Sequence, residues 1–92
     1  MHIFFSGIGG TGIGPLALIA KQAGYDVSGS DQQSSNYTDY LSKHGISDIH
    51  IGQTVEQIHQ VHEKHPIDWI VHSSAVKSDH PELNFAKTNH IK

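Results

Sequence analysis

The chain has 92 residues, with nine acidic against six basic side chains and a formal net charge of −3. A chain of this length forms one domain rather than two, and a protein that binds nucleic acid generally would show a basic excess that this composition lacks. The sequence contains no cysteine, which excludes disulfides and thiol chemistry. Its apolar runs are too short to span a membrane and no signal peptide is visible, so we expect a cytoplasmic protein.

The first half of the chain alternates between strand and helix patterns. An apolar run predicts a strand over His2–Ser6, and helical spacing of apolar residues predicts a helix over Ile13–Ala23. Pro15 falls in the first turn of that helix, where a missing N–H costs little, and Gly24 fits its C-terminal end. The alternating segment Tyr25–Ser30 predicts a second strand.

The second half repeats this alternation with shorter elements. Thr54 and Gln57 have capping-box spacing at the start of a helix, and Pro66 ends that helix. The elements expected here are a helix over Tyr37–His44, a strand over Asp48–Ile51, a helix over Thr54–His65, a strand over Ile67–Val71 and a helix from about Asp79 to Asn89. The order predicts an α/β fold, a Rossmann-like doubly wound parallel sheet of four or five strands in a three-layer α/β/α arrangement, with strand order 3-2-1-4.

The strongest functional signal is the glycine-rich turn Gly7–Gly12 (GIGGTG) between the first strand and the first helix. It contains G-x-G-x-x-G, and Asp31 follows at the end of the next strand, which is typical of dinucleotide-binding folds. The free N–H groups and dipole of a helix N-terminus attract phosphate, and glycine lets phosphate approach the backbone. No lysine or arginine lies in the turn, so we predict a diphosphate site made of backbone amides. The alternative is a tight turn that packs without a ligand.

Two further candidates belong to the same edge of the predicted sheet. Asp31 would accept hydrogen bonds from a ribose, or else cap a turn in the polar loop that follows it. Ser73, Ser74 and Ala75 follow the fourth strand, which lies beside the first in the predicted order. Their hydroxyls and amides would complete a diphosphate site, although an ordinary polar turn explains them as well.

The nine histidines give no catalytic signal. His59, His62 and His65 lie three residues apart on one predicted helix, but no recognisable pattern of further ligands accompanies them, so we expect solvated helix surface rather than a metal site. His72 is expected to be a packed histidine bonded to backbone rather than a catalytic base. No nucleophile–base pair can be identified, and no catalytic residue is proposed.

Three segments together resemble the N-terminal domain of the Mur ligases of bacterial peptidoglycan synthesis. They are Gly7–Asp31 with GIGG-x-G and GSD, His50–His65 with HIG, and Val71–Leu83 with SSA. The resemblance covers nearly the whole chain. It implies that residues 1–92 are a single UDP-sugar-binding domain, the N-terminal fragment of a larger three-domain ligase.

The resemblance also implies a ligand and its contacts. The domain would hold the UDP part of UDP-N-acetylmuramic acid, with no cofactor of its own and neither nucleic acid nor membrane as partner. ATP and Mg²⁺ would bind to the central domain of the parent enzyme. That enzyme would join a carboxylate to an amine, and this fragment alone would be inactive. The implied contacts are Gly9, Gly10, Thr11 and Gly12 with the diphosphate, Asp31 and Gln32 with the uridine, and Ser73, Ser74 and Ala75 on the opposite side.

The chain departs from the family pattern at four positions. The family usually has serine and glycine where this chain has Gly14 and Pro15, and it often has histidine at the position of Gln53 and asparagine at that of His80. Two other functions stay open at this stage. One is an NAD-binding regulatory or oxidoreductase module that uses the same turn and Asp31. The other is a ligand-free domain that only packs against a partner.

Overall fold

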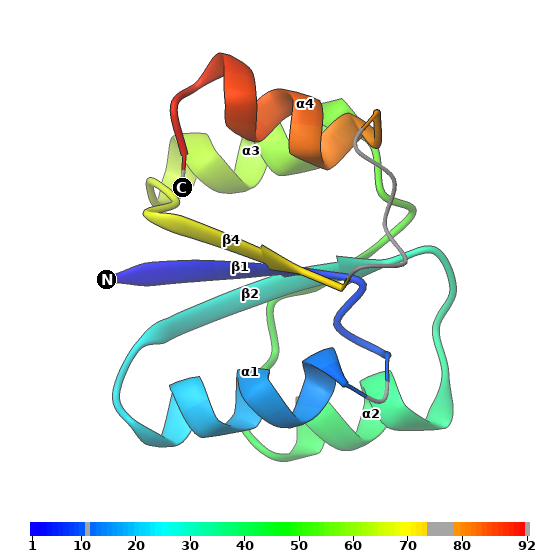
Figure 1. Cartoon of the computed structure of the whole chain (residues 1–92). Coiled ribbons are helices and arrows are strands. Elements are labelled where there is room, and N and C mark those ends of the chain that lie inside the picture. The colour runs from blue at the N-terminus through cyan, green and yellow to red at the C-terminus, as the bar shows by residue number, and fades with distance from the viewer. Residues whose placement is uncertain (11, 74–78, 92) are drawn as a thin grey trace.

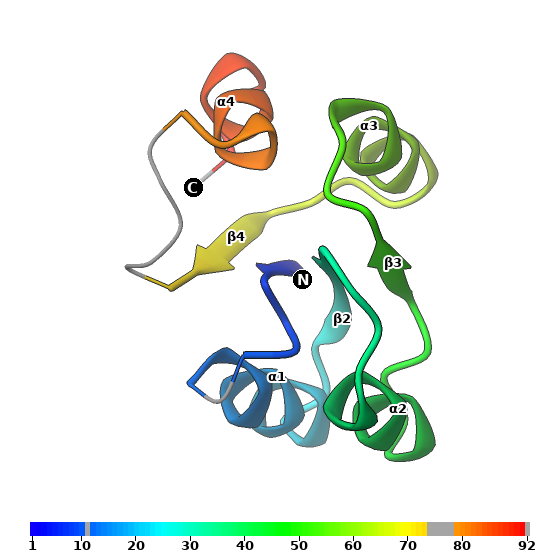
Figure 2. The ribbon, with the colours of Figure 1, turned by 90° about the vertical axis from the view of Figure 1, so that its right-hand side faces the viewer.

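The computed structural model describes residues 1–10, 12–73 and 79–91. The elements in chain order are β1 (His2–Ser6), α1 (Ile13–Gln22), β2 (Asp26–Asp31), α2 (Asn36–Lys43), β3 (Ile49–Ile51), α3 (Val55–Lys64), β4 (Trp69–His72) and α4 (Pro81–Thr88). All strand pairs are parallel, and their order is β3-β2-β1-β4. Helices α1 and α2 cover one face of the sheet, while α3 and α4 cover the other (Figures 1 and 2). The predicted doubly wound sheet and its strand order are confirmed, with four strands in the described residues.

Local sequence signals account for the helix starts. The Thr54 hydroxyl accepts a hydrogen bond from the Gln57 amide at the start of α3. Helix α2 begins one residue earlier than predicted, because Ser35 and Thr38 cap it reciprocally through side chain and backbone. None of the helices in the described part of the chain is long and apolar enough to cross a membrane.

The core lies in two layers, one on each face of the sheet. Alternation along β1 sends Phe4 toward α3 and α4, and Phe5 toward α1 and α2. The layer under α1 and α2 consists of Phe5, Ile8, Ile13, Ala17, Val27, Leu41 and Ile46. The opposite layer consists of Phe4, Ile58, Val61, Ile67 and Phe85. Packing on both faces leaves the carboxyl edge of the strands, where the chain turns into the helices, as the place for a ligand.

One feature of the second layer is unusual for a buried sheet. Ser6, Ser28 and Ser30 lie on the face toward α3 and α4, and each is at most 1% exposed. Ser6 and Ser30 are register partners at the carboxyl ends of β1 and β2. Buried hydroxyls need hydrogen-bond partners, so a polar group must meet each of them inside the protein.

Candidate functional site

The glycine-rich turn folds back onto the end of β2. Gly7 has a φ of 77°, a left-handed conformation that favours glycine. The amides of Gly7 and Ile8 both donate to the Ser30 carbonyl oxygen at 2.9 Å, and the Ile8 side chain is fully buried. The turn is therefore fixed to the neighbouring strand at its beginning.

Asp31 holds the middle of the same turn. Its Oδ2 accepts a hydrogen bond from the Gly9 amide at 2.8 Å, and its Oδ1 accepts one from the Gln32 amide at 2.8 Å. A Cβ at Gly9 would lie only 2.7 Å from Oδ2, so this contact requires glycine. Asp31 thus caps a turn, as the alternative interpretation of the sequence expected. A carboxylate has further lone pairs, so its contact with a ribose stays a prediction.

The amide donors left at the start of α1 differ from those that the family resemblance implies. The Gly10 amide donates to the Gly7 carbonyl oxygen at 3.0 Å, so the Gly9 and Gly10 amides are both used within the protein. Those of Gly12 and Ile13 donate to no other residue that the structure describes. No acidic side chain lies in the first turn of α1, and no side chain caps Gly12. The N-terminus of α1 therefore offers two amides and a positive dipole to an anion.

The other predicted site residues are only partly placed. Ser73 is half-buried and follows β4, whose last residue His72 is the register partner of Ser6. This pairing puts Ser73 at the same edge of the sheet as the glycine turn. Gln32 is exposed beside Asp31. Thr11, Ser74 and Ala75 lie outside the described residues.

The sequence analysis missed a buried polar cluster directly beneath this edge. Glu82, in the first turn of α4, is 1% exposed. Its Oε1 accepts hydrogen bonds from the hydroxyls of Ser6 at 2.5 Å and Ser30 at 2.8 Å. We call the set Ser6, Ser30, Gln53, His80 and Glu82 the serine–glutamate cluster. In the sequence, Glu82 after Pro81 indicates only an ordinary helix start. The burial of Ser6 and Ser30 is the one feature that indicates a polar partner.

Gln53 and His80 form the half-buried side of the cluster. Gln53 Nε2 lies 3.3 Å from Ser30 Oγ and 3.4 Å from Glu82 Oε1. The Gln53 Oε1 atom lies 3.2 Å from His80 Nε2, and His80 Nδ1 accepts a hydrogen bond from the Glu82 amide at 3.1 Å. The loop after β3 and the start of α4 are therefore joined at the carboxyl edge of the sheet.

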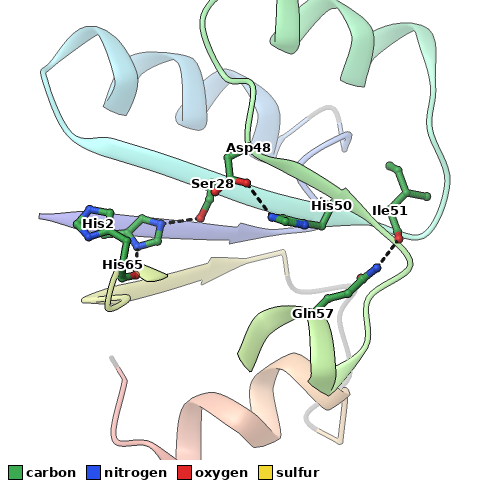
Figure 3. A network of polar contacts seen from close by, with 7 residues as sticks. All are labelled: His2, Ser28, Asp48, His50, Ile51, Gln57 and His65. Atoms are coloured by element: carbon green, nitrogen blue, oxygen red, sulfur yellow. Dashed lines mark hydrogen bonds and ion pairs between the residues drawn. The ribbon is translucent and has the colours of Figure 1, made fainter. Parts of the chain in front are cut away.

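A second polar network lies at the opposite, amino edge of β1 (Figure 3). The rings of His2 and His65 stack with centroids 4.5 Å apart and an interplanar angle of 3°. His2 Nδ1 donates to the His65 carbonyl oxygen at 2.8 Å, and His2 Nε2 lies 2.6 Å from Ser28 Oγ. His65 Nε2 also contacts Asp26 Oδ2 at 2.9 Å. His65 is exposed as predicted, but it joins β1, β2 and α3 rather than being only solvated surface.

The contact with His65 affects the acidity of Asp26. The pKa of this carboxyl is lowered from its ordinary value of 3.8, first because it accepts the hydrogen bond from His65, and then through positive charge on His65, the N-terminus and His2. Slight burial opposes this effect. A cavity of about 290 Å³ at this edge is lined by residues that include His2, Asp26 and His65, far from the glycine turn.

The remaining histidines do not suggest chemistry. His59 pairs with Glu63 at 2.8 Å on the surface of α3, and His62 Nδ1 accepts the Ile67 amide at 2.9 Å. His72 bonds to backbone as expected, through Nδ1 and the Ser73 carbonyl oxygen at 2.9 Å, but it is exposed, so the prediction that it is packed is wrong. Position 72 is on the edge strand β4, where no further strand covers it in the described residues. Among those residues, no group of three or more ligating side chains could hold a metal ion.

Comparison with known proteins identifies relatives of this arrangement. The profile of the Mur ligase family, catalytic domain, matches residues 2–92. A UDP-N-acetylmuramate–L-alanine ligase of Acetivibrio thermocellus is 45% identical over 87 residues, which are 95% of this chain and 17% of that protein.

Solved structures give the same result. The UDP-N-acetylmuramate-alanine ligase of Thermotoga maritima superposes with a TM-score of 0.84 at 32% identity, over 99% of this chain and 20% of that one. The UDP-N-acetylmuramate:L-alanyl-gamma-D-glutamyl-meso-diaminopimelate ligase of Neisseria meningitides gives 0.81 at 31% identity, over 98% of this chain and 26% of that one. The chain thus spans about a fifth of the length of these relatives. Relatives of this kind do not favour the NAD-binding alternative.

Proposed function

The chain belongs to the Mur ligase family, and on this premise we propose that it binds the UDP part of a UDP-N-acetylmuramic acid substrate for an ATP-dependent, amide-forming ligase of peptidoglycan synthesis. The observation that carries the proposal is the carboxyl edge of the sheet. There the glycine turn, which Asp31 holds through the Gly9 amide, leads into the N-terminus of α1, where the amides of Gly12 and Ile13 have no described partner.

The diphosphate is the part of the ligand that this edge suits best. It carries negative charge, and the start of α1 combines two amides, a positive dipole and no acidic side chain in the first turn. Gly9 and Gly10 act by keeping the backbone bare, because their amides already serve Asp31 and the Gly7 carbonyl oxygen. Thr11 and the Gly12 amide complete this side of the proposed site.

The nucleoside and the opposite wall follow from the same edge. Asp31 and Gln32 stand at the end of β2, where a ribose or uracil attached to the diphosphate would pass. Ser73, Ser74 and Ala75 close the site from β4. The proposed domain has no cofactor of its own. ATP, Mg²⁺ and the amino-acid acceptor belong to further domains of the kind that the longer relatives have, and the chain alone carries out no ligation.

A titration followed by residue-resolved NMR tests the proposal. UDP-N-acetylmuramic acid, UDP and NAD are added separately to ¹⁵N-labelled protein. The amide signals of Gly12 and Ile13 should shift with both UDP ligands and more weakly with NAD. Shifts confined to the α3 helix would contradict the proposed site, and a stronger response to NAD would contradict the proposed ligand.

A further inference from the structure

Glu82 stands out because it is polar and buried but is none of the residues of the proposed site. Its carboxyl group lies on the sheet face under α3 and α4, where it is 1% exposed. The hydroxyls of Ser6 and Ser30 both donate to its Oε1. Each serine is at the carboxyl end of a central strand, and the next residues are Gly7 and Asp31, from which the proposed site is built.

Neither core stability nor ligand attraction explains this placement. A buried carboxyl costs free energy unless it is well hydrogen-bonded, and an apolar residue of similar volume often serves a core as well. A carboxyl group beneath a diphosphate also offers this anion no positive charge. What the carboxyl does provide is a common acceptor for two donors on adjacent strands, which fixes the relative position of the strand ends.

The hydrogen bonds continue from Glu82 into the glycine turn. Ser30, whose hydroxyl donates to Glu82, also accepts the amides of Gly7 and Ile8 through its carbonyl oxygen. Asp31 follows directly and accepts the Gly9 amide. We infer that Glu82 is a positioning residue, which sets the glycine turn and thereby the diphosphate-binding amides through Ser6 and Ser30.

The same carboxyl also contacts the loop after β3. Gln53 Nε2 lies 3.4 Å from Glu82 Oε1, and Gln53 Oε1 lies 3.2 Å from His80 Nε2. The effect of the carboxyl on ligand affinity rests on the proposed function. The effect of Glu82 on the turn does not, because its contacts with Ser6 and Ser30, and those of Ser30 and Asp31 with the turn, all lie within the protein.

Two substitutions test the carboxyl group as a hydrogen-bond acceptor. Glu82→Gln keeps an oxygen for the two serines, whereas Glu82→Met keeps the length and removes the acceptor. Phe85→Leu is the matched control, because Phe85 is buried in the same helix but contacts the apolar layer. Amide hydrogen exchange of Gly7, Ile8 and Gly9 is measured first without ligand, and UDP affinity is measured second, both well below the melting temperature of each variant.

Glu82→Met should speed amide exchange at Gly7, Ile8 and Gly9 by about tenfold relative to the rest of β1. It should also weaken UDP binding by about tenfold, the effect of roughly one lost hydrogen bond. Glu82→Gln should keep both the exchange rates of the turn and the UDP affinity within about threefold of wild type, since glutamine supplies an acceptor. Phe85→Leu should change neither locally. Unchanged exchange at the turn in folded Glu82→Met would overturn the inference. If the wild type itself fails to bind UDP, the proposed function fails, while the exchange result still decides the role of Glu82.

Discussion

The side chains of Gln53 and His80 meet through Oε1 and Nε2 at 3.2 Å, so two positions at which the chain departs from the Mur ligase pattern are in contact. The family often has histidine at position 53 and asparagine at position 80. This chain instead has the amide at position 53 and the imidazole at position 80, so the two residue types have exchanged positions. An exchange of this kind preserves one donor and one acceptor across the contact.

The contact predicts coupled effects of substitution. Gln53→His or His80→Asn alone should lower the free energy of unfolding by about 1 kcal/mol, because each leaves a half-buried partner without its matched group. The double variant Q53H/H80N should recover at least half of the summed loss, which urea unfolding of all four proteins measures as a coupling energy. Strictly additive losses would show that the two positions are independent.

Gly14 shows a second departure with a structural reason. A Cβ at this position would lie 2.2 Å from Cε2 of Tyr37, which packs across the start of α1. The family serine would not fit under this ring. In an open helix, glycine to alanine stabilises by up to about 1 kcal/mol, but the overlap here should make Gly14→Ala destabilising by about 1–3 kcal/mol.

Because the overlap is with the Tyr37 ring, removing the ring should change the sign of the stability effect of Gly14→Ala. In a Tyr37→Ala background, Gly14→Ala should become neutral or stabilising in thermal unfolding. Gly12→Ala is the control, because nothing lies within 4 Å of a Cβ there and its φ is −88°. If Gly14→Ala destabilises the protein equally with and without Tyr37, the loss has another origin.

The parts of the fold that follow from local pattern were predictable. The alternation of apolar runs with helical spacing predicted the sheet order, because right-handed parallel crossovers leave few topologies. The start of α2 was misplaced because its cap, Ser35 with Thr38, lacks the glutamate or glutamine that marks a capping box. Local boundaries depend on such single contacts.

The candidate site was predictable in location but not in its internal bonds. The glycine spacing and Asp31 identified the edge of the sheet, yet the sequence does not show that the Gly9 amide is used by Asp31. Glu82 was missed because its partners Ser6 and Ser30 are distant in the chain and look like exposed positions of alternating strands. In a parallel sheet covered on both faces, such serines are buried and need a partner.

The Asp26–His65 contact predicts how stability depends on pH. The folded-state pKa of Asp26 is below its ordinary value of 3.8, so the ionised carboxyl favours the folded state. This contribution is present above about pH 3.8 and is lost as the pH falls through the lower, folded-state pKa. Asp26→Asn should therefore destabilise the protein at pH 5, with a difference from wild type that disappears in strong acid.

Thermal unfolding between pH 2.5 and 6 checks this dependence, in a range that brackets the ordinary pKa of aspartate. Asp79→Asn serves as the control, because it removes an exposed carboxyl outside this contact. A difference between Asp26→Asn and wild type that stays constant across the whole range would show that the charge of Asp26 plays no part.

The bond between the Asp31 carboxylate and the Gly9 amide allows the structural role of this carboxylate to be separated from its proposed contact with the nucleoside. Asp31→Ala removes the acceptor of the Gly9 amide, so the turn loosens and both UDP and inorganic diphosphate should bind more weakly, by about tenfold for one lost charge-assisted bond. Asp31→Asn keeps an oxygen for Gly9 and should hold diphosphate affinity within about threefold. Gly10→Val, whose Cβ would lie 3.2 Å from the Gly7 carbonyl oxygen and project from an exposed position, should abolish binding of both ligands. Calorimetric titration of each variant with both ligands gives the comparison. A loss of UDP affinity in Asp31→Ala with diphosphate affinity unchanged would mean that Asp31 acts on the ribose alone and that the turn keeps its shape without this bond.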